Sequence, residues 1–259
     1  MLSISKRLRF TISSLILFSG FISIQFLNDT YKFAAIAILV IITGLLSVWS
    51  FYEGLGLDMT LSSIILPMMF TLGVGIFWFL LPANLYTRIP IVIFFTFGIY
   101  VLLSTMNIYT VSSSKTIALL RAARGVGFVL TLVSSFLLFD AILSIRQNVF
   151  ISSPLVFISS LLLFLQGFWS IELEKKLDKI TFLVSFISSV VITELSILIF
   201  FWPVTVVVGS LFLTSGVYML LGLGQTKLED RLFPGAIREY LTVGLIVLIG
   251  MFFATHWGG

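Results

Sequence analysis

The chain has 259 residues, of which 59% are hydrophobic and 10% are charged. Soluble domains average about 45–50% apolar and about 25% charged residues, so water is a poor solvent for most of this sequence. The composition excludes a soluble globular protein and predicts an all-α, polytopic transmembrane helix bundle. The net charge of +4 follows the expected membrane topology, so we expect no nucleic-acid partner.

Nine stretches of the chain are apolar enough to cross a membrane. A spanning helix needs about 20 apolar residues. The predicted spans are 10–27, 33–52, 59–81, 89–108, 122–144, 149–170, 180–201, 203–222 and 239–256. We expect residues 1–259 to form a single integral membrane domain containing these spans.

The apolar run over 180–222 contains no polar loop, although it is about twice the length of one crossing. We predict its turn at Trp202-Pro203, because Trp favours the membrane interface and Pro suits the first position of a helix. A turn at Glu194 is the alternative, but it would leave two spans of very unequal length.

Lys and Arg residues predict the orientation, because they gather on the inner side of membranes. With the N-terminus inside and the C-terminus outside, twelve of the fifteen fall in inner segments and three in outer ones. The outer ones are Lys32, Arg88 and Arg146. We expect an uncleaved first helix and a location in the plasma membrane. The inner segment 223–238 is also expected to hold a short interfacial helix that ends at Pro234-Gly235.

Several chemistries are excluded by residue counts. The chain has no Cys and one His, His256 near its end. It can therefore form no disulfide, thiolate site or paired-histidine metal site. We expect no metal and no cofactor. Motifs of membrane proteases and transferases are missing, so the sequence leans away from an enzyme without deciding the question.

Two carboxyl groups within the spans are the main candidates for function. Asp140 lies six residues before Arg146, and Glu194 lies about fourteen residues into the seventh span among apolar neighbours. An ionisable group at such depth is costly and suggests a functional site. The sequence predicts a proton- or cation-binding site at Glu194 and Asp140. Alternatively, Asp140 reaches the outer interface and Glu194 bonds to a neighbouring helix.

Other polar residues give weaker signals. Gln166 is a polar intramembrane residue that we expect to bond across helices. A set of inner basic residues could contact anionic lipid or phosphate, or could simply determine topology. This set is Arg121, Arg124, Lys175, Lys176 and Lys179. Small polar residues also recur at helical spacing in the seventh span, which favours close helix packing over a solute pathway. They are Ser185, Ser189, Thr193 and Ser196.

Two functional hypotheses follow from these observations. The first is a non-catalytic membrane component, such as a complex subunit, assembly factor or scaffold, whose partners are the lipid bilayer and other membrane proteins. The alternative is a proton- or cation-coupled small-solute transporter that uses Glu194 and Asp140. The transporter hypothesis requires the two carboxyl groups to face a common cavity.

Overall fold

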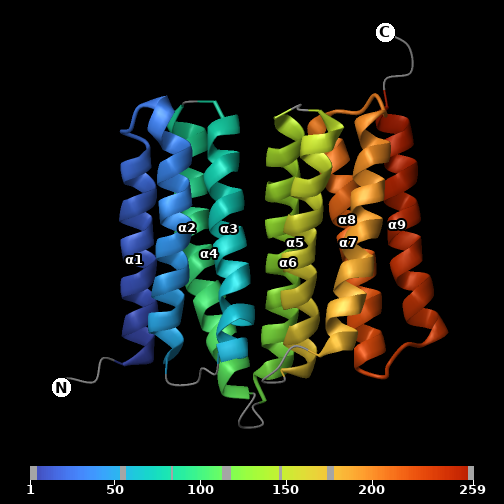
Figure 1. The fold of residues 1–259 in the computed structure, drawn as a ribbon, viewed down its shortest axis with the longest axis horizontal. Coiled ribbons are helices and arrows are strands. Elements are labelled where there is room, and N and C mark those ends of the chain that lie inside the picture. The colour runs from blue at the N-terminus through green and yellow to red at the C-terminus, as the bar shows by residue number, and fades with distance from the viewer. Residues whose placement is uncertain are drawn as a thin grey trace. The chain divides into compact units, whose positions relative to one another are not determined.

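A computed structural model of the chain describes residues 5–52, 57–82, 84–112, 118–145, 148–173 and 178–255. Over these residues the chain is all-helical, with nine helices and no strands (Figure 1). The helices are α1 Lys6–Ile24, α2 Asp29–Phe51, α3 Leu57–Leu80, α4 Leu85–Ser112, α5 Leu120–Ser144, α6 Val149–Glu172, α7 Lys179–Phe200, α8 Val206–Leu228 and α9 Pro234–Ala254. By length and composition each could cross a membrane, which suggests an integral membrane protein.

Each predicted span falls on one helix, and the turn in the long apolar run is confirmed. Helix α7 ends at Phe200 and α8 begins at Val206, on either side of Trp202-Pro203. Pro203 is not the first helical residue, however. Thr205 occupies the N-cap and its hydroxyl oxygen accepts a hydrogen bond from the Val208 N–H. This cap satisfies a backbone donor that would otherwise lack a helical partner.

The prediction of a short interfacial helix within 223–238 is wrong. Helix α8 continues to Leu228 instead, and Pro234 is the first residue of α9. Proline lacks an N–H donor, so it fits the first turn of a helix, where that donor has no partner. The Pro234-Gly235 pair therefore begins a helix that is long and apolar enough to cross a membrane. Asp230 turns the chain between α8 and α9 with a backbone φ of 54°.

The helices form two compact units. Unit 1 comprises Met1–Leu130 with Leu173–Lys176, and unit 2 comprises Thr131–Glu172 with Leu177–Gly259. The boundary falls inside α5. Unit 1 therefore contains α1 to α4 and the start of α5, and unit 2 contains the rest of α5 and α6 to α9.

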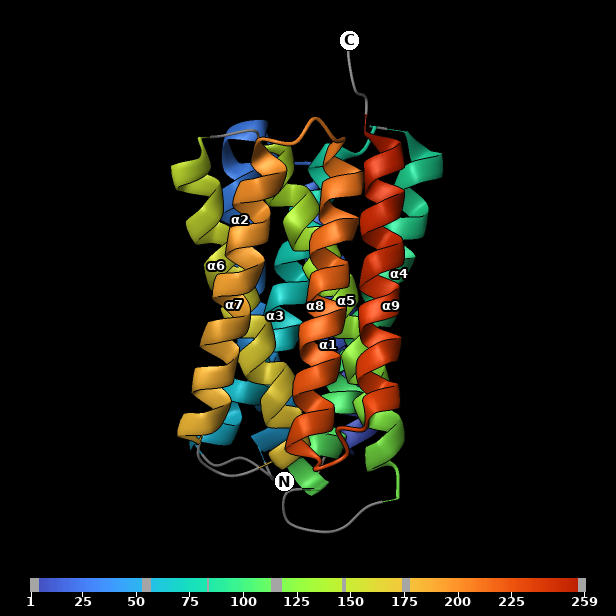
Figure 2. The same ribbon diagram turned by 90° about the vertical axis from the view of Figure 1, so that its right-hand side faces the viewer.

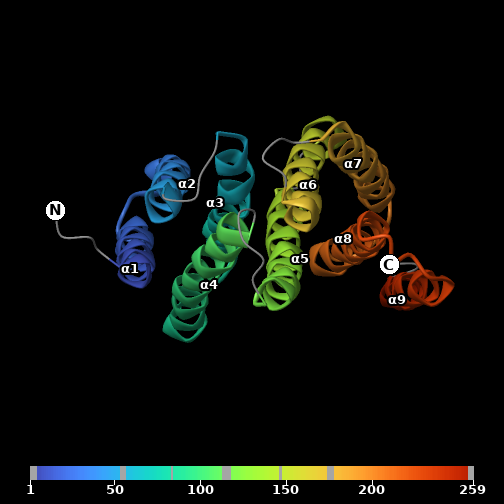
Figure 3. The same ribbon diagram turned by 90° about the horizontal axis from the view of Figure 1, so that it is seen from below.

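In unit 1 the first four helices form a closed bundle. Helices α1 and α3 each contact both α2 and α4 (Figure 3). Aromatic rings fill its interior: the Phe21 and Phe95 ring centroids lie 4.6 Å apart, and Phe70 stacks on Phe95 at 6.2 Å. Gly98 leaves the space that the Phe70 ring occupies, so α3 and α4 can approach closely.

In unit 2, α8 lies between α7 and α9 (Figure 2). Glycines allow the close approach of α9: Gly222 faces the Tyr240 ring and Gly244 faces Met219. Apart from this contact, α9 presents many large apolar side chains on the surface, including Ile246 and Phe253. Such an apolar surface suits lipid or the helices of another membrane protein.

Candidate functional site

Asp140 is buried at the contact between α5 and α8. Its side chain is 4% exposed, and the Ser210 hydroxyl on α8 lies 3.3 Å from Asp140 Oδ1. The same hydroxyl lies 2.7 Å from the Val206 carbonyl oxygen of its own helix. A hydroxyl has one proton, so it donates to either acceptor in turn. Asp140 therefore has a single, shared hydrogen-bond donor among the described residues.

Glu194 has different surroundings. Its side chain is exposed on the surface of α7, whereas Asp140 is buried. Among the described residues no contact joins the two carboxyl groups. Binding of a proton or cation at either position stays a prediction, and the structure does not bring the two into one site.

The small polar residues of α7 are satisfied by their own helix. The hydroxyls of Ser185, Ser189, Thr193 and Ser196 donate to carbonyl oxygens three or four residues earlier at 2.7 Å. Three of these residues are buried or nearly so against neighbouring helices. This arrangement suits close helix packing, because the hydroxyls are already bonded and add little bulk.

The weaker candidates lie in separate places. Gln166 is buried in α6, and the Thr131 hydroxyl on α5 donates to its Oε1 at 3.5 Å, which fits the expected bond across helices. Arg121 is exposed and Arg124 half-buried in the first turns of α5, and Lys179 is exposed at the start of α7. Lys175 and Lys176 lie outside the described residues.

An apolar hollow of about 390 Å³ lies between helices of unit 2. Leu195, the residue after Glu194, lines it from α7, and Gly216 and Met219 line it from α8. Gly244 and Leu248 complete it from α9. The hollow is thus a groove that opens between α7 and α9 with α8 as its floor.

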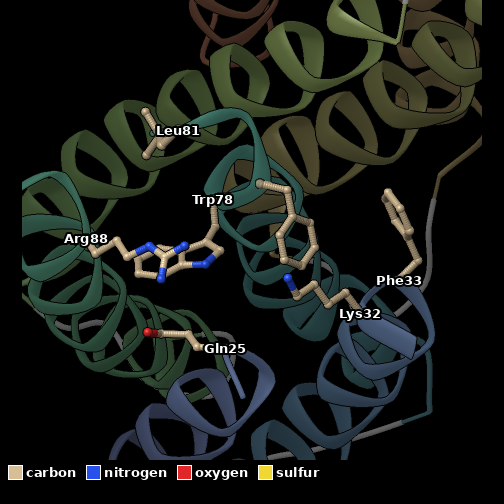
Figure 4. Close-up of a pocket in the computed structure, with 7 residues that line it drawn as sticks. Gln25, Lys32, Phe33, Trp78, Leu81 and Arg88 are labelled. Carbon is tan, nitrogen blue, oxygen red and sulfur yellow. The ribbon is translucent and has the colours of Figure 1, made fainter. Parts of the chain in front are cut away.

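A polar and aromatic pocket of about 300 Å³ lies at one end of unit 1. The end of α1, the start of α2, the end of α3 and the start of α4 all contribute to it (Figure 4). Its lining comprises Gln25, Lys32, Phe33, Trp78, Phe79, Leu81 and Arg88. Antiparallel connections bring these four helix ends together, because α1 and α3 end where α2 and α4 begin.

Two cations in this pocket lie over aromatic rings. The Arg88 guanidinium carbon is 5.3 Å from the centre of the Trp78 ring, and Lys32 Nζ is 5.7 Å from that of Phe79. The negative face of an aromatic ring attracts a cation at such distances. Trp78 is itself fixed, because it is buried and packs edge-on against Phe21 at 5.3 Å. The pocket therefore holds two cationic side chains, one of which lies against a buried ring.

The comparisons with known proteins identify the family but no activity. A family model described as "Protein of unknown function (DUF5656)" matches residues 15–254. The chain belongs to this family. The match begins inside α1 and extends to the last residue of α9, so it covers most of both units of the DUF5656 chain. No curated protein and no solved structure matches the chain.

Sequence reasoning assigned Lys32 and Arg88 to outer segments but missed the pocket in this DUF5656 protein. The signal was present, because the first and second predicted outer loops bring Lys32 and Arg88 to the same side of the bundle. Trp78 precedes the second of these loops. What the sequence could not supply was the pairing of helices, which decides that these particular ends surround one hollow.

Proposed function

We propose that this protein is a non-catalytic component of a membrane complex and that the face of α7 around Glu194 meets a helix of a partner membrane protein. The N-terminus inside, the C-terminus outside and a plasma-membrane location belong to the same proposal. The exposure of Glu194 carries it. The nine apolar helices suggest the membrane protein, and the partner is the further step.

An exposed carboxyl group on a spanning helix is costly unless something covers it. Glu194 lies six residues before the end of α7, which is about 9 Å along the helix. Its neighbours Ile197 and Leu198 are also exposed, so the surrounding surface is apolar. Facing hydrocarbon costs an ionisable group roughly 2.5–3.5 kcal/mol on insertion scales. A partner helix with a hydrogen-bond donor would remove most of that cost.

The groove supports a helix as the covering element, because Leu195, which lines it, directly follows Glu194 in α7. Gly216 and Gly244 line it, but they face Ile192 and Met219 of the same unit, and Leu195 and Leu248 give the groove apolar sides. Membrane helices associate through small residues that allow close approach and through polar side chains that bond across the contact. The groove offers an apolar surface to such a helix, and Glu194 offers the polar side chain.

The transporter alternative has less support. It needs Asp140 and Glu194 at a common cavity, yet one is buried at the α5–α8 contact and the other is exposed on α7. The hydroxyls along α7 bond to their own helix and do not line the described hollows. These features favour an assembly role for α7.

Co-purification tests the proposal. The tagged full chain is extracted from its own membranes in mild detergent, and native mass spectrometry measures the ratio of partner to tagged protein. Glu194→Leu should lower that ratio about tenfold, because one charge-assisted hydrogen bond is worth roughly 1.5–3 kcal/mol. Glu194→Gln should retain most of the partner, since an amide still accepts and donates hydrogen bonds. Glu239→Leu, which changes an exposed glutamate of α9, is the matched control.

Two results would contradict the proposal. One is a wild-type particle that contains a single chain and no other protein. The other is an equal loss of partner in the Glu194→Leu and Glu239→Leu variants. A single-chain particle whose proton-dependent solute uptake disappears in Glu194→Gln would instead support the transporter.

A further inference from the structure

We propose that the pocket at the end of unit 1 binds a phosphate-type anion between Lys32 and Arg88. This inference is independent of the partner helix proposed for α7, because it concerns other helices and a different ligand chemistry. It rests on the charge, the orientation of the cations and the size of the pocket.

The pocket concentrates positive charge. Lys32 and Arg88 both line it, and each is the fourth residue of its helix, α2 and α4 (Figure 4). In the sequence, Asp29 is the one acidic residue near this end of the unit, and its side chain lies outside those described. Two cationic side chains line one hollow of about 300 Å³, and an anion between them would be attracted to both.

Arg88 is oriented as an anion-binding group. The Trp78 ring occupies one face of its guanidinium, and no hydrogen bond from that guanidinium to a described residue is formed. A guanidinium has five N–H donors, and the contact of its carbon with a ring supplies no oxygen acceptor for them, so a ligand can provide one. Their fork matches two oxygens of a phosphate, while the Lys ammonium adds a compact point charge.

The remaining lining indicates what accompanies the anion. Gln25 supplies an amide, and Phe33, Trp78 and Phe79 supply aromatic surface. Arg88, Lys32 and Gln25 are only partly buried, so the pocket opens at the helix ends. Trp and Tyr favour the level of lipid headgroups, and a volume near 300 Å³ is at the lower end for small-molecule sites. Both features suit a phosphate on a lipid headgroup or a free phosphate ion.

Native mass spectrometry tests this site. The purified full chain in detergent is incubated with phosphatidic acid or with phosphatidylcholine, and the bound lipid is counted. Phosphatidic acid should bind at least about tenfold more tightly, and Lys32→Gln/Arg88→Gln should abolish that preference. Arg238→Gln removes an arginine from the first turns of a helix outside the pocket, so it is the control and should change binding less than about twofold.

A second arm distinguishes the two sources of phosphate. Inorganic phosphate is titrated at constant ionic strength against the lipid-loaded protein. Displacement of phosphatidic acid by millimolar phosphate indicates a site for the free ion, and retention of the lipid indicates a headgroup site. Both results support anion binding at this pocket, provided that the double variant lacks it.

Variants that fold incorrectly are recognised by circular dichroism and size-exclusion elution before binding is compared. Arg88→Lys gives a second measure, because it keeps the charge and loses the planar fork. It should bind phosphatidic acid more weakly than the wild type and more strongly than the double variant. The proposal is overturned if the folded double variant binds phosphatidic acid as tightly as the wild type, or if Arg238→Gln loses binding equally.

Discussion

The two units keep their ionisable side chains in different surroundings. In unit 1, Arg9 and Arg88 lie over aromatic rings near helix ends. In unit 2, the carboxyl groups of Asp140 and Glu194 lie four and six residues before the ends of α5 and α7, respectively. An aromatic ring offsets part of the cost of taking a cation from water, whereas a carboxyl group needs hydrogen-bond donors. Unit 1 therefore supplies aromatic rings to these two arginines, whereas unit 2 supplies few hydrogen-bond donors to Glu194.

Within unit 1 the same ring contact serves two arginines differently. The Arg9 guanidinium lies 4.7 Å from the centre of the Tyr52 ring, and Arg9 is 3% exposed. Its Nη1 also lies 3.5 Å from the Trp49 carbonyl oxygen near the end of α2. Arg88 has the ring contact and is only half-buried. Arg9 therefore joins α1 to α2, whereas the guanidinium donors of Arg88 form no hydrogen bond with a described residue and can bind a ligand.

The largest expected effect is the loss of stability in Arg9→Met. This change removes the contact with the Tyr52 ring and the donor to the Trp49 carbonyl oxygen. We expect the free energy of unfolding to fall by about 2 kcal/mol. Thermal unfolding in detergent, followed by tryptophan fluorescence, measures it. Arg7→Met changes an exposed arginine of the same helix and should cost less than about 0.5 kcal/mol. Equal losses of stability in the two variants would contradict a structural role for Arg9.

A smaller effect is expected at Asp140. Asp140→Ala leaves a small cavity at the α5–α8 contact and should cost about 1 kcal/mol of unfolding free energy. Asp140→Asn keeps the volume and can still accept the Ser210 hydroxyl, so its stability should stay within about 0.5 kcal/mol of the wild type. The same thermal measurement compares them. A large loss in Asp140→Asn would show that the carboxyl group itself is required, for example to hold a cation.

The helices could be predicted from sequence because the bilayer imposes one length and one polarity on each of them. Hydropathy located every spanning helix, and Trp202-Pro203 marked the break between α7 and α8. Helix ends were less certain. The span predicted at 89–108 is α4 over Leu85–Ser112, since helices continue into interfacial segments that are less apolar than the hydrocarbon core. The Pro234-Gly235 pair was misread because proline can begin a helix as well as follow one.

The candidate site could be predicted only in part, because side-chain function depends on which helices touch. Hydropathy placed Asp140 and Glu194 within helices, but it could not show that one is buried against Ser210 and the other exposed. Lys32 and Arg88 were predicted to lie on the same side of the membrane. Their convergence with Trp78 needed the packing of four helix ends, which has no periodic signal in one sequence.

The smallest expected effect is that of Arg88→Met on the protein without anionic lipid. Only the contact with Trp78 is lost, so stability should fall by about 0.5 kcal/mol, well below the effect of Arg9→Met. Adding phosphatidic acid should separate the two variants further. A ligand that binds only the folded protein stabilises it by an amount that grows with its concentration relative to its dissociation constant. Wild type and Arg9→Met should therefore gain thermal stability with phosphatidic acid, and Arg88→Met should gain much less. Equal gains in all three would contradict the availability of Arg88 for a ligand, even if the difference in stability between Arg9→Met and Arg88→Met holds.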